Sequence, residues 1–159
     1  MLPETVLRLS NVMFVEANAP PSVPPRILNV EEDTLARMCG EVDAFTVVCG
    51  DGKERGYMVC YRAGGNPARL NFTLAHELGH IILRHEGKGD AEEKEADCFA
   101  SHLLCPEPML EEMKECGAEI IAHTFFVTRM AAEQVRRRKK CEIPEELLLK
   151  IQQNTNEKE

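Results

Sequence analysis

The most informative stretch of the sequence is His76-Glu77-Leu78-Gly79-His80. Histidines at positions i and i+4 lie on one face of a helix, about 40° apart around its axis and one turn apart along it. Two imidazole nitrogens placed in this way can bind one zinc ion, and the glutamate beside the first histidine can accept a proton from water. The pattern is short enough to arise by chance, and the alternative is a helix that carries two polar histidines without a metal.

The residues around this motif predict a long, half-buried helix. Asn66 is a suitable N-cap, Pro67 suits the first helical position, and Gly87 suits the position just past the end. Apolar residues and one histidine recur at helical spacing on its buried stripe: Leu74, Leu78, Ile81, Ile82 and His85.

A catalytic zinc site needs a third protein ligand, and the next segment offers several. Asp90 and Glu93 have the spacing of a capping box, and Pro106 ends the second helix after Cys105. The Gly-Lys-Gly link at 87–89 is short, so the two helices should pack as antiparallel neighbours.

Depth from the turn favours Glu95 as the third ligand. His80 lies about 9 Å before Glu86, the expected end of the first helix, at 1.5 Å per residue. Glu95 lies about 7.5 Å after Asp90, at a similar depth.

Other residues of the second helix remain as weaker alternatives for the third ligand. The apolar stripe of this second helix consists of Ala96, Phe99, Ala100 and Leu103. Glu92 is closer to the turn, and Asp97 lies on the other flank of this stripe. His102 and Cys98 point away from this stripe.

The two motifs together resemble the ImmA/IrrE family of zinc metallopeptidases, whose pattern reads RxxFTLAHELGH followed by EAxxFAxxLLxP. The matching positions are Arg69, 72–80, 95–100 and 103–106, with Cys105 where the family often has Met. The resemblance covers roughly residues 56–140, is weak before 45 and is absent after about 142.

This resemblance implies a zincin-like fold and a set of roles. His76, His80 and Glu95 would bind Zn²⁺, and Glu77 would be the catalytic base. A donor for the oxyanion is also needed, and the candidates from the sequence are Tyr57, Tyr61, Arg69 and His123.

The resemblance also implies a substrate. Members of this family cleave, or trigger the inactivation of, a helix-turn-helix repressor, often encoded beside them on a phage or mobile element. The resemblance therefore implies a zinc endopeptidase that acts as a derepression switch. The alternative is a zinc-containing module that binds a repressor without cutting it.

Composition indicates one small cytoplasmic domain over residues 1–152, followed by a polar tail at 153–159. The 159 residues contain no long apolar run and no signal peptide, so we expect neither a membrane span nor secretion. Seven cysteines without CxxC spacing indicate free thiols in a reducing compartment.

The fold class predicted is α+β, with a small sheet packed on the active helix and a mostly helical C-terminal half. Residues 44–49 and 56–62 are strand-like and flank a Gly-Asp-Gly turn, which predicts a hairpin whose edge could hold a substrate peptide. Residues 1–29 form an arm that is hard to place, within which 6–15 could be a strand or a short helix; prolines at 20–25 predict an extended connection, and a short helix is expected at 31–39.

After Pro106 we expect short helices at 108–116, 118–126 and 129–140, with Thr128 as an N-cap, and a last helix from Pro144. The helix–turn–helix spacing of 118–140 and the basic run 136–140 also fit a DNA-binding module. A formal net charge of −8 disfavours that reading, so we expect no direct contact with nucleic acid.

Overall fold

The computed structural model describes residues 12–16, 42–50, 56–62, 64–87, 89–137, 145 and 148–149. The expected extended connection at 20–25, the helix at 31–39, the hairpin turn at 51–52, the basic residues 138–140 and the tail at 153–159 lie outside these residues. The chain divides into two compact units, residues 2–74 and 75–159, which are taken in turn. The prediction of one domain over 1–152 stays a prediction.

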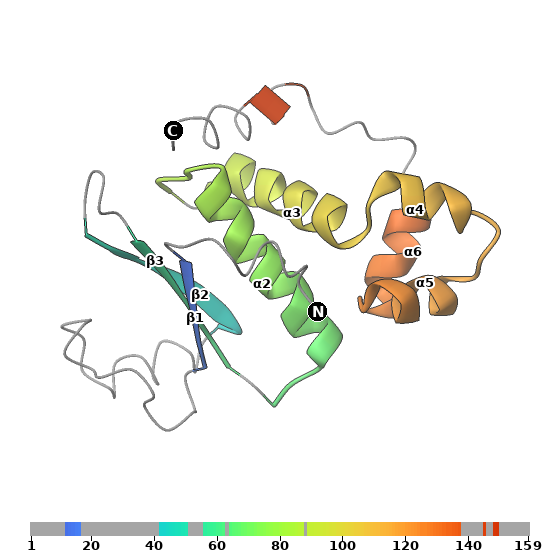
Figure 1. Ribbon diagram of the computed structural model, residues 1–159, viewed down its shortest axis with the longest axis horizontal. Coiled ribbons are helices and arrows are strands. Elements are labelled where there is room, and N and C mark those ends of the chain that lie inside the picture. The colour runs from blue at the N-terminus through green and yellow to red at the C-terminus, as the bar shows by residue number, and fades with distance from the viewer. Residues whose placement is uncertain are drawn as a thin grey trace. The chain divides into compact units, whose positions relative to one another are not determined.

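The first unit contains a three-stranded sheet in the order β1-β3-β2 (Figure 1). The strands are β1 (Val12–Glu16), β2 (Ala44–Cys49) and β3 (Gly56–Tyr61). β3 pairs antiparallel with β2, from Ala44 opposite Tyr61 to Cys49 opposite Gly56, which confirms the predicted pairing of these strands. β1 pairs parallel with β3, so the described part of the segment that could be a strand or a short helix is a strand. Of the two hairpin strands, β2 is the outer one among the described residues, because β3 lies between β1 and β2.

Alternation of side chains explains why these segments form a sheet. Phe45, Met58 and Cys60 are buried on one face and form a small apolar cluster with three partly buried neighbours: Val15, Val47 and Cys49. These residues come from alternate positions of each strand, the period that places side chains on one face.

Helix α2 (Pro67–Ile82) begins where the sequence predicts. The Asn66 side-chain oxygen accepts hydrogen bonds from the backbone N–H groups of Ala68 and Arg69, at 3.0 and 3.3 Å. Pro67 then needs no N–H partner, because the first helical position has none. Asn66 is therefore the N-cap.

The C-terminal end of α2 differs from the prediction. The helix ends at Ile82, and Arg84 takes a left-handed conformation with φ 55°. The N–H of Arg84 donates to the Ile81 carbonyl and the N–H of His85 donates to the His80 carbonyl, at 3.2 and 3.0 Å. This pair of bonds is the Schellman cap, which usually has glycine at the left-handed position. The expected end at Glu86, with Gly87 as the cap, was therefore wrong.

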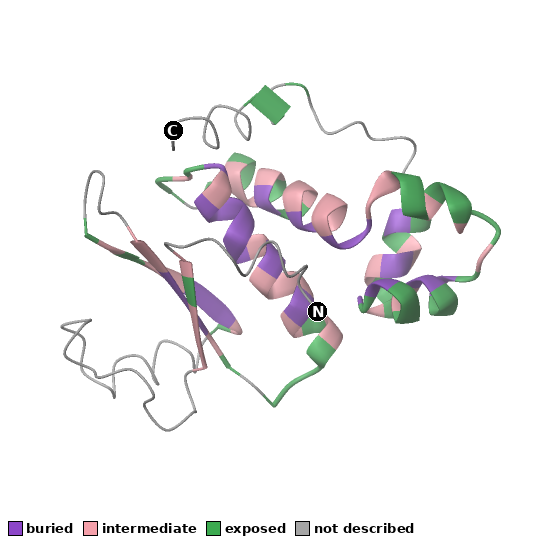
Figure 2. Cartoon of the chain, viewed as in Figure 1, coloured by how far each residue is buried: buried purple, intermediate pink, exposed green. Residues whose placement is uncertain are grey.

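Helix α3 (Asp90–Leu104) follows after the short link. Its N-cap is Gly89, which carries no side-chain cap, so the expected Asp90–Glu93 capping box does not form. Ala96 and Ala100 are fully buried, and Figure 2 shows buried positions along both α2 and α3.

Three shorter helices follow between residues 107 and 137: α4 (Glu107–Glu112), α5 (Ala118–Phe125) and α6 (Arg129–Arg137). The Thr128 hydroxyl accepts a hydrogen bond from the Ala131 N–H at 3.2 Å, which confirms its predicted role as a cap. The fold is α+β, with a small mixed sheet and a mostly helical remainder, in keeping with a zincin-like fold.

Candidate metal centre

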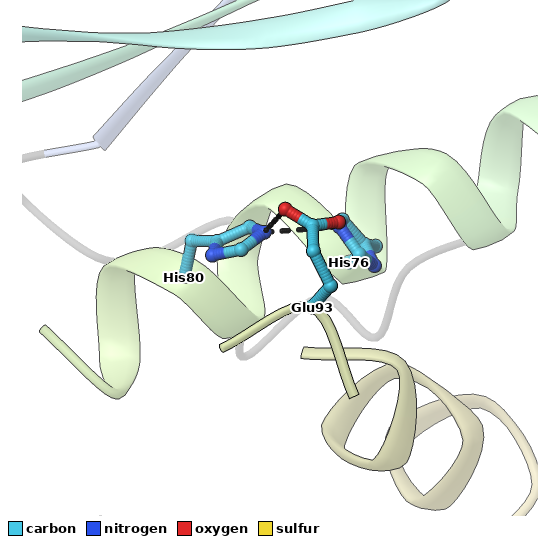
Figure 3. A group of neighbouring side chains, drawn as sticks. All are labelled: His76, His80 and Glu93. Atoms are coloured by element: carbon cyan, nitrogen blue, oxygen red, sulfur yellow. Dashed lines mark hydrogen bonds and ion pairs between the residues drawn. The ribbon is translucent and has the colours of Figure 1, made fainter. Parts of the chain in front are cut away.

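Three side chains from α2 and α3 converge on one point (Figure 3). The Nε2 atoms of His76 and His80 lie 3.0 Å apart. The Glu93 carboxylate faces both of them, with Oε2 3.2 Å from His76 Nε2 and Oε1 3.5 Å from His80 Nε2. Two imidazoles and one carboxylate are the donor set of many catalytic zinc sites.

These spacings fit a tetrahedral ion. Zinc bonds of about 2.0–2.2 Å in a tetrahedral arrangement separate the ligand atoms by roughly 3.3–3.6 Å. The two Nε2 atoms are 3.0 Å apart, and the two Glu93 oxygens lie 3.2 Å from one Nε2 and 3.5 Å from the other, so each of these separations is within a few tenths of an ångström of that range. The chemistry and closeness of these three side chains therefore fit a small divalent cation.

The other ring nitrogens of both histidines have partners of their own. His76 Nδ1 lies 2.8 Å from Asp97 Oδ1. His80 Nδ1 lies 2.9 Å from His85 Nδ1, whose Nε2 in turn lies 3.1 Å from Glu95 Oε2. When both Nδ1 atoms carry their protons toward these partners, both Nε2 lone pairs point toward Glu93. Three acceptors then face each other, an arrangement that a cation stabilises.

Burial of His80 favours its neutral form, which is the form that binds a metal. The pKa of His80 is lowered from 6.5, chiefly because burial penalises its charged form and secondly because His76 is close. The carboxylates of Glu77 and Glu93 oppose this shift, and His85 adds to it. A histidine must be neutral to bind a metal, so the lowered pKa favours the binding form.

Glu77 is buried, with 4% of its surface exposed, and its charge acts on His80. It is the acidic residue of the HExxH motif and lies next to the first histidine. Its burial close to the two histidines is compatible with the role of base that the resemblance implies.

Close packing of α2 on α3 brings Glu93 to the histidines. A Cβ atom at Gly79 would lie only 3.1 Å from the Cα of Ala96 and 3.2 Å from its carbonyl oxygen. Gly79 is therefore the residue of α2 that allows this approach. Ala96 lies one turn after Glu93 on α3, so the same approach sets the distance of the carboxylate.

Two of the three predicted ligands lie together in the structure, and the acid beside them is a different residue. His76 and His80 come together as predicted, but Glu93 is the acid beside them, and Glu95 contacts His85. The sequence reasoning missed Glu93, His85 and the contact of Asp97 with His76. One signal could have indicated them, since Glu93 and Asp97 are four residues apart on α3, as the histidines are on α2.

The weaker ligand alternatives and the candidate oxyanion donors from the sequence lie as follows. Cys98 Sγ lies 3.6 Å from His102 Nδ1 within α3, so these two residues contact each other. Arg69 forms an ion pair with Asp43 at 2.6 Å, and His123 is exposed on α5. Tyr57 and Tyr61 lie on β3. A role for any of the four in binding an oxyanion stays a prediction.

A family model described as the IrrE N-terminal-like domain, of the M78 peptidases, matches residues 41–135. The chain belongs to the M78 peptidase family. The match covers α2, α3 and every side chain of the candidate metal centre. No match was found among curated proteins or among solved structures.

Membership of the M78 family makes this chain a metallopeptidase domain, with proteins as its substrate class. Five cysteines fall among the described residues, and none of them forms a disulfide: Cys49, Cys60, Cys98, Cys105 and Cys116. Within the described residues, none of the helices has the length and apolarity needed to cross a bilayer.

Proposed function

We propose that this protein is a zinc-dependent endopeptidase whose ion is held by His76, His80 and Glu93. The observation that supports this assignment is the convergence of two Nε2 atoms and one carboxylate at 3.0–3.5 Å. Glu95, which depth along the helix favours, is 3.1 Å from His85 instead, so we assign it to the surroundings of the site.

When bound, the ion would supply Lewis-acid chemistry, polarising a peptide carbonyl and lowering the pKa of water. Glu77 would accept a proton from the attacking water and deliver it to the departing amine. Its burial supports this role, because a carboxylate shielded from bulk water interacts more strongly with the reacting groups.

We propose a helix-turn-helix repressor as the substrate, cleaved or inactivated in the cytoplasm as a derepression switch. M78 membership supports a protein substrate, and the resemblance to the ImmA/IrrE family supports this particular class. The alternative is a zinc-containing module that binds such a repressor without cutting it.

The metal assignment is tested by zinc content after purification and desalting. Parent protein should hold about one zinc per chain, and His80→Ala and Glu93→Ala should hold nearly none. Glu92→Ala is the matched control, because it removes the neighbouring carboxylate on the same helix, and it should keep its zinc, whereas Glu95→Ala should lose less zinc than Glu93→Ala. Loss of zinc in Glu95→Ala with retention in Glu93→Ala would restore Glu95 as the ligand.

The peptidase assignment is tested by Glu77→Gln, which keeps the size of the side chain but removes its basicity. Zinc content and repressor binding should be nearly unchanged, whereas cleavage should fall by about 10²–10⁴-fold. The assay is a candidate repressor incubated with each protein and analysed for fragments. Equal derepression by Glu77→Gln and parent in cells would favour the binding module.

A further inference from the structure

Asp43 is held at the end of the β2–β3 hairpin through both its backbone and its side chain. It lies directly before β2, and Arg62 lies directly after β3, so the two residues extend the strand pairing one step beyond Ala44 and Tyr61. The Arg62 N–H donates to the Asp43 carbonyl at 3.0 Å, and Arg62 Nη2 donates to Asp43 Oδ1 at 3.3 Å. The hairpin therefore sets the position of the Asp43 carboxylate.

The second carboxylate oxygen of Asp43 reaches helix α2. Arg69 Nη2 lies 2.6 Å from Asp43 Oδ2, which is a short, charge-assisted contact. Arg69 lies in the first turn of α2, and its own N–H donates to the Asn66 cap. One carboxylate thus bridges two guanidinium groups, one after the hairpin and one on the helix. All of these residues belong to the compact unit of residues 2–74.

Arg69 lies on the same face of α2 as the two histidines of the candidate metal centre. His76 follows it at about 10.5 Å along the helix and about 20° to one side, because seven residues make nearly two turns. His80 lies about 20° to the other side, because eleven residues make slightly more than three turns. A restraint on the Arg69 side chain therefore opposes rotation of this face about the helix axis.

We propose that Asp43 is a positioning residue, which acts through Arg69 to keep the histidine-bearing face of α2 in one direction relative to the hairpin. This inference rests on the proposed function, because the benefit of a fixed direction is a substrate peptide aligned for attack. The side chains of Asp43, Arg62 and Arg69 are 30%, 45% and 71% exposed. Ion pairs as exposed as these contribute little to stability, so the role should appear in helix orientation and in cleavage rate.

The first measurement is made on metal-free protein at low salt, because salt screens exposed ion pairs. Residual dipolar couplings of backbone amides report the orientation of residues 67–74 relative to β2 and β3. In the parent, one alignment tensor should fit both sets of amides. Asp43→Asn has one acceptor oxygen in place of two, so it cannot bridge both guanidinium groups, and the two sets should require separate tensors. Arg69→Lys keeps a charged donor and should stay close to the parent.

Arg129→Gln is the matched control for these variants. Arg129 also lies in the first turn of its helix, is 72% exposed and pairs with one carboxylate, that of Glu119, at 3.3 Å. Its replacement should leave a single tensor for α2 and the hairpin. Arg69→Gln gives the same test as Asp43→Asn if the latter fails to fold, because Arg69 is the more exposed partner.

The second measurement is cleavage of a candidate repressor by zinc-loaded protein. Asp43→Asn should keep its zinc, because Asp43 is not among the three converging side chains. Its kcat should fall about 10–100-fold with KM nearly unchanged, since a misplaced reacting group slows the chemical step. Asp43→Glu keeps both carboxylate oxygens and should recover part of the rate.

The outcomes separate the two proposals. A single tensor for α2 and the hairpin in Asp43→Asn would overturn the positioning role. A raised KM with unchanged kcat would also overturn it, and would assign Arg62 and Arg69 to direct binding of an acidic group of the substrate. Failure of the parent to bind zinc would overturn the proposed function alone, because the dipolar couplings are read without metal or substrate.

Discussion

At the scale of single residues, His80 combines burial with four charged or titratable neighbours. Burial and His76 lower its pKa, so the folded protein favours the neutral ring more than the unfolded chain does. Above the unfolded value of 6.5 both states are neutral, and the difference has no effect on stability. As the pH falls below 6.5, the unfolded chain binds the proton first, so the free energy of unfolding decreases.

We therefore predict that the melting temperature of metal-free protein falls as the pH is lowered from 7 to 5.5. His80→Asn, which keeps a polar group but cannot titrate, should show a smaller fall over the same range. Thermal unfolding followed by circular dichroism in a chelating buffer measures both. Equal falls in parent and variant would assign the pH dependence to other groups.

Residue identities also show how far the sequence determines the site. The HExxH spacing alone brings His76 and His80 together, because helix geometry fixes it. The choice of the acidic third ligand depends on where the first helix ends. The sequence predicts that end at Glu86, because glycine, here Gly87, is the usual residue in a left-handed cap. With the observed end at Ile82, His80 lies about 3 Å from the helix end and Glu93 about 4.5 Å from the start of α3. The same depth argument then favours Glu92 and Glu93 over Glu95, and the structure places Glu93 beside the histidines.

At the scale of elements, two helices end at left-handed residues that are not glycine. Arg84 and Phe126 have φ of 55° and 53°, and each follows directly on the last turn of α2 or α5. A side chain in this conformation costs about 1–2 kcal/mol, so an arginine is an unusual cap and the end of α2 was predicted too late. The predicted end of the 118–126 helix lies within one residue of the observed end of α5. The N-caps Asn66 and Thr128 were predictable because their side chains make the capping bonds themselves.

The approach of α2 to α3 predicts the effect of Gly79→Ala. The added Cβ would meet the backbone of Ala96, which cannot yield locally, so α3 must shift by a few tenths of an ångström. Overpacking costs about 1–3 kcal/mol, partly offset by the better helix propensity of alanine. We expect a lower midpoint of denaturant unfolding and weaker zinc binding, because the shift moves Glu93.

Gly87→Ala is the control for this substitution, because a Cβ there meets no atom within 4 Å. It should leave both quantities near their parent values. If Gly79→Ala bound zinc as tightly as Gly87→Ala, the spacing of the two helices would not control the metal site.

At the scale of the whole molecule, the fold class followed from patterns of short range. Period-two alternation predicted β2 and β3, and helical periodicity with caps predicted α2, α3, α5 and α6. The parallel pairing of β1 with β3 could not be predicted, because it joins segments more than forty positions apart, from Val12 opposite Tyr57 onward. Such pairing depends on tertiary packing, which local propensity does not encode.

Every group assigned here to the metal and its surroundings lies between His76 and Asp97, and this has a consequence for the order of folding. Contacts between residues near in sequence require little loss of chain entropy, so they can form before long-range strand pairing. An ion bound there would join the two helices of one helical hairpin and would not stabilise the strand pairing of the sheet. Hydrogen exchange with and without zinc tests this: amides of 76–104 should gain the most protection, and a gain shared equally with β1–β3 would contradict it. The metal would then stabilise the helical hairpin early in folding and supply catalysis in the folded protein.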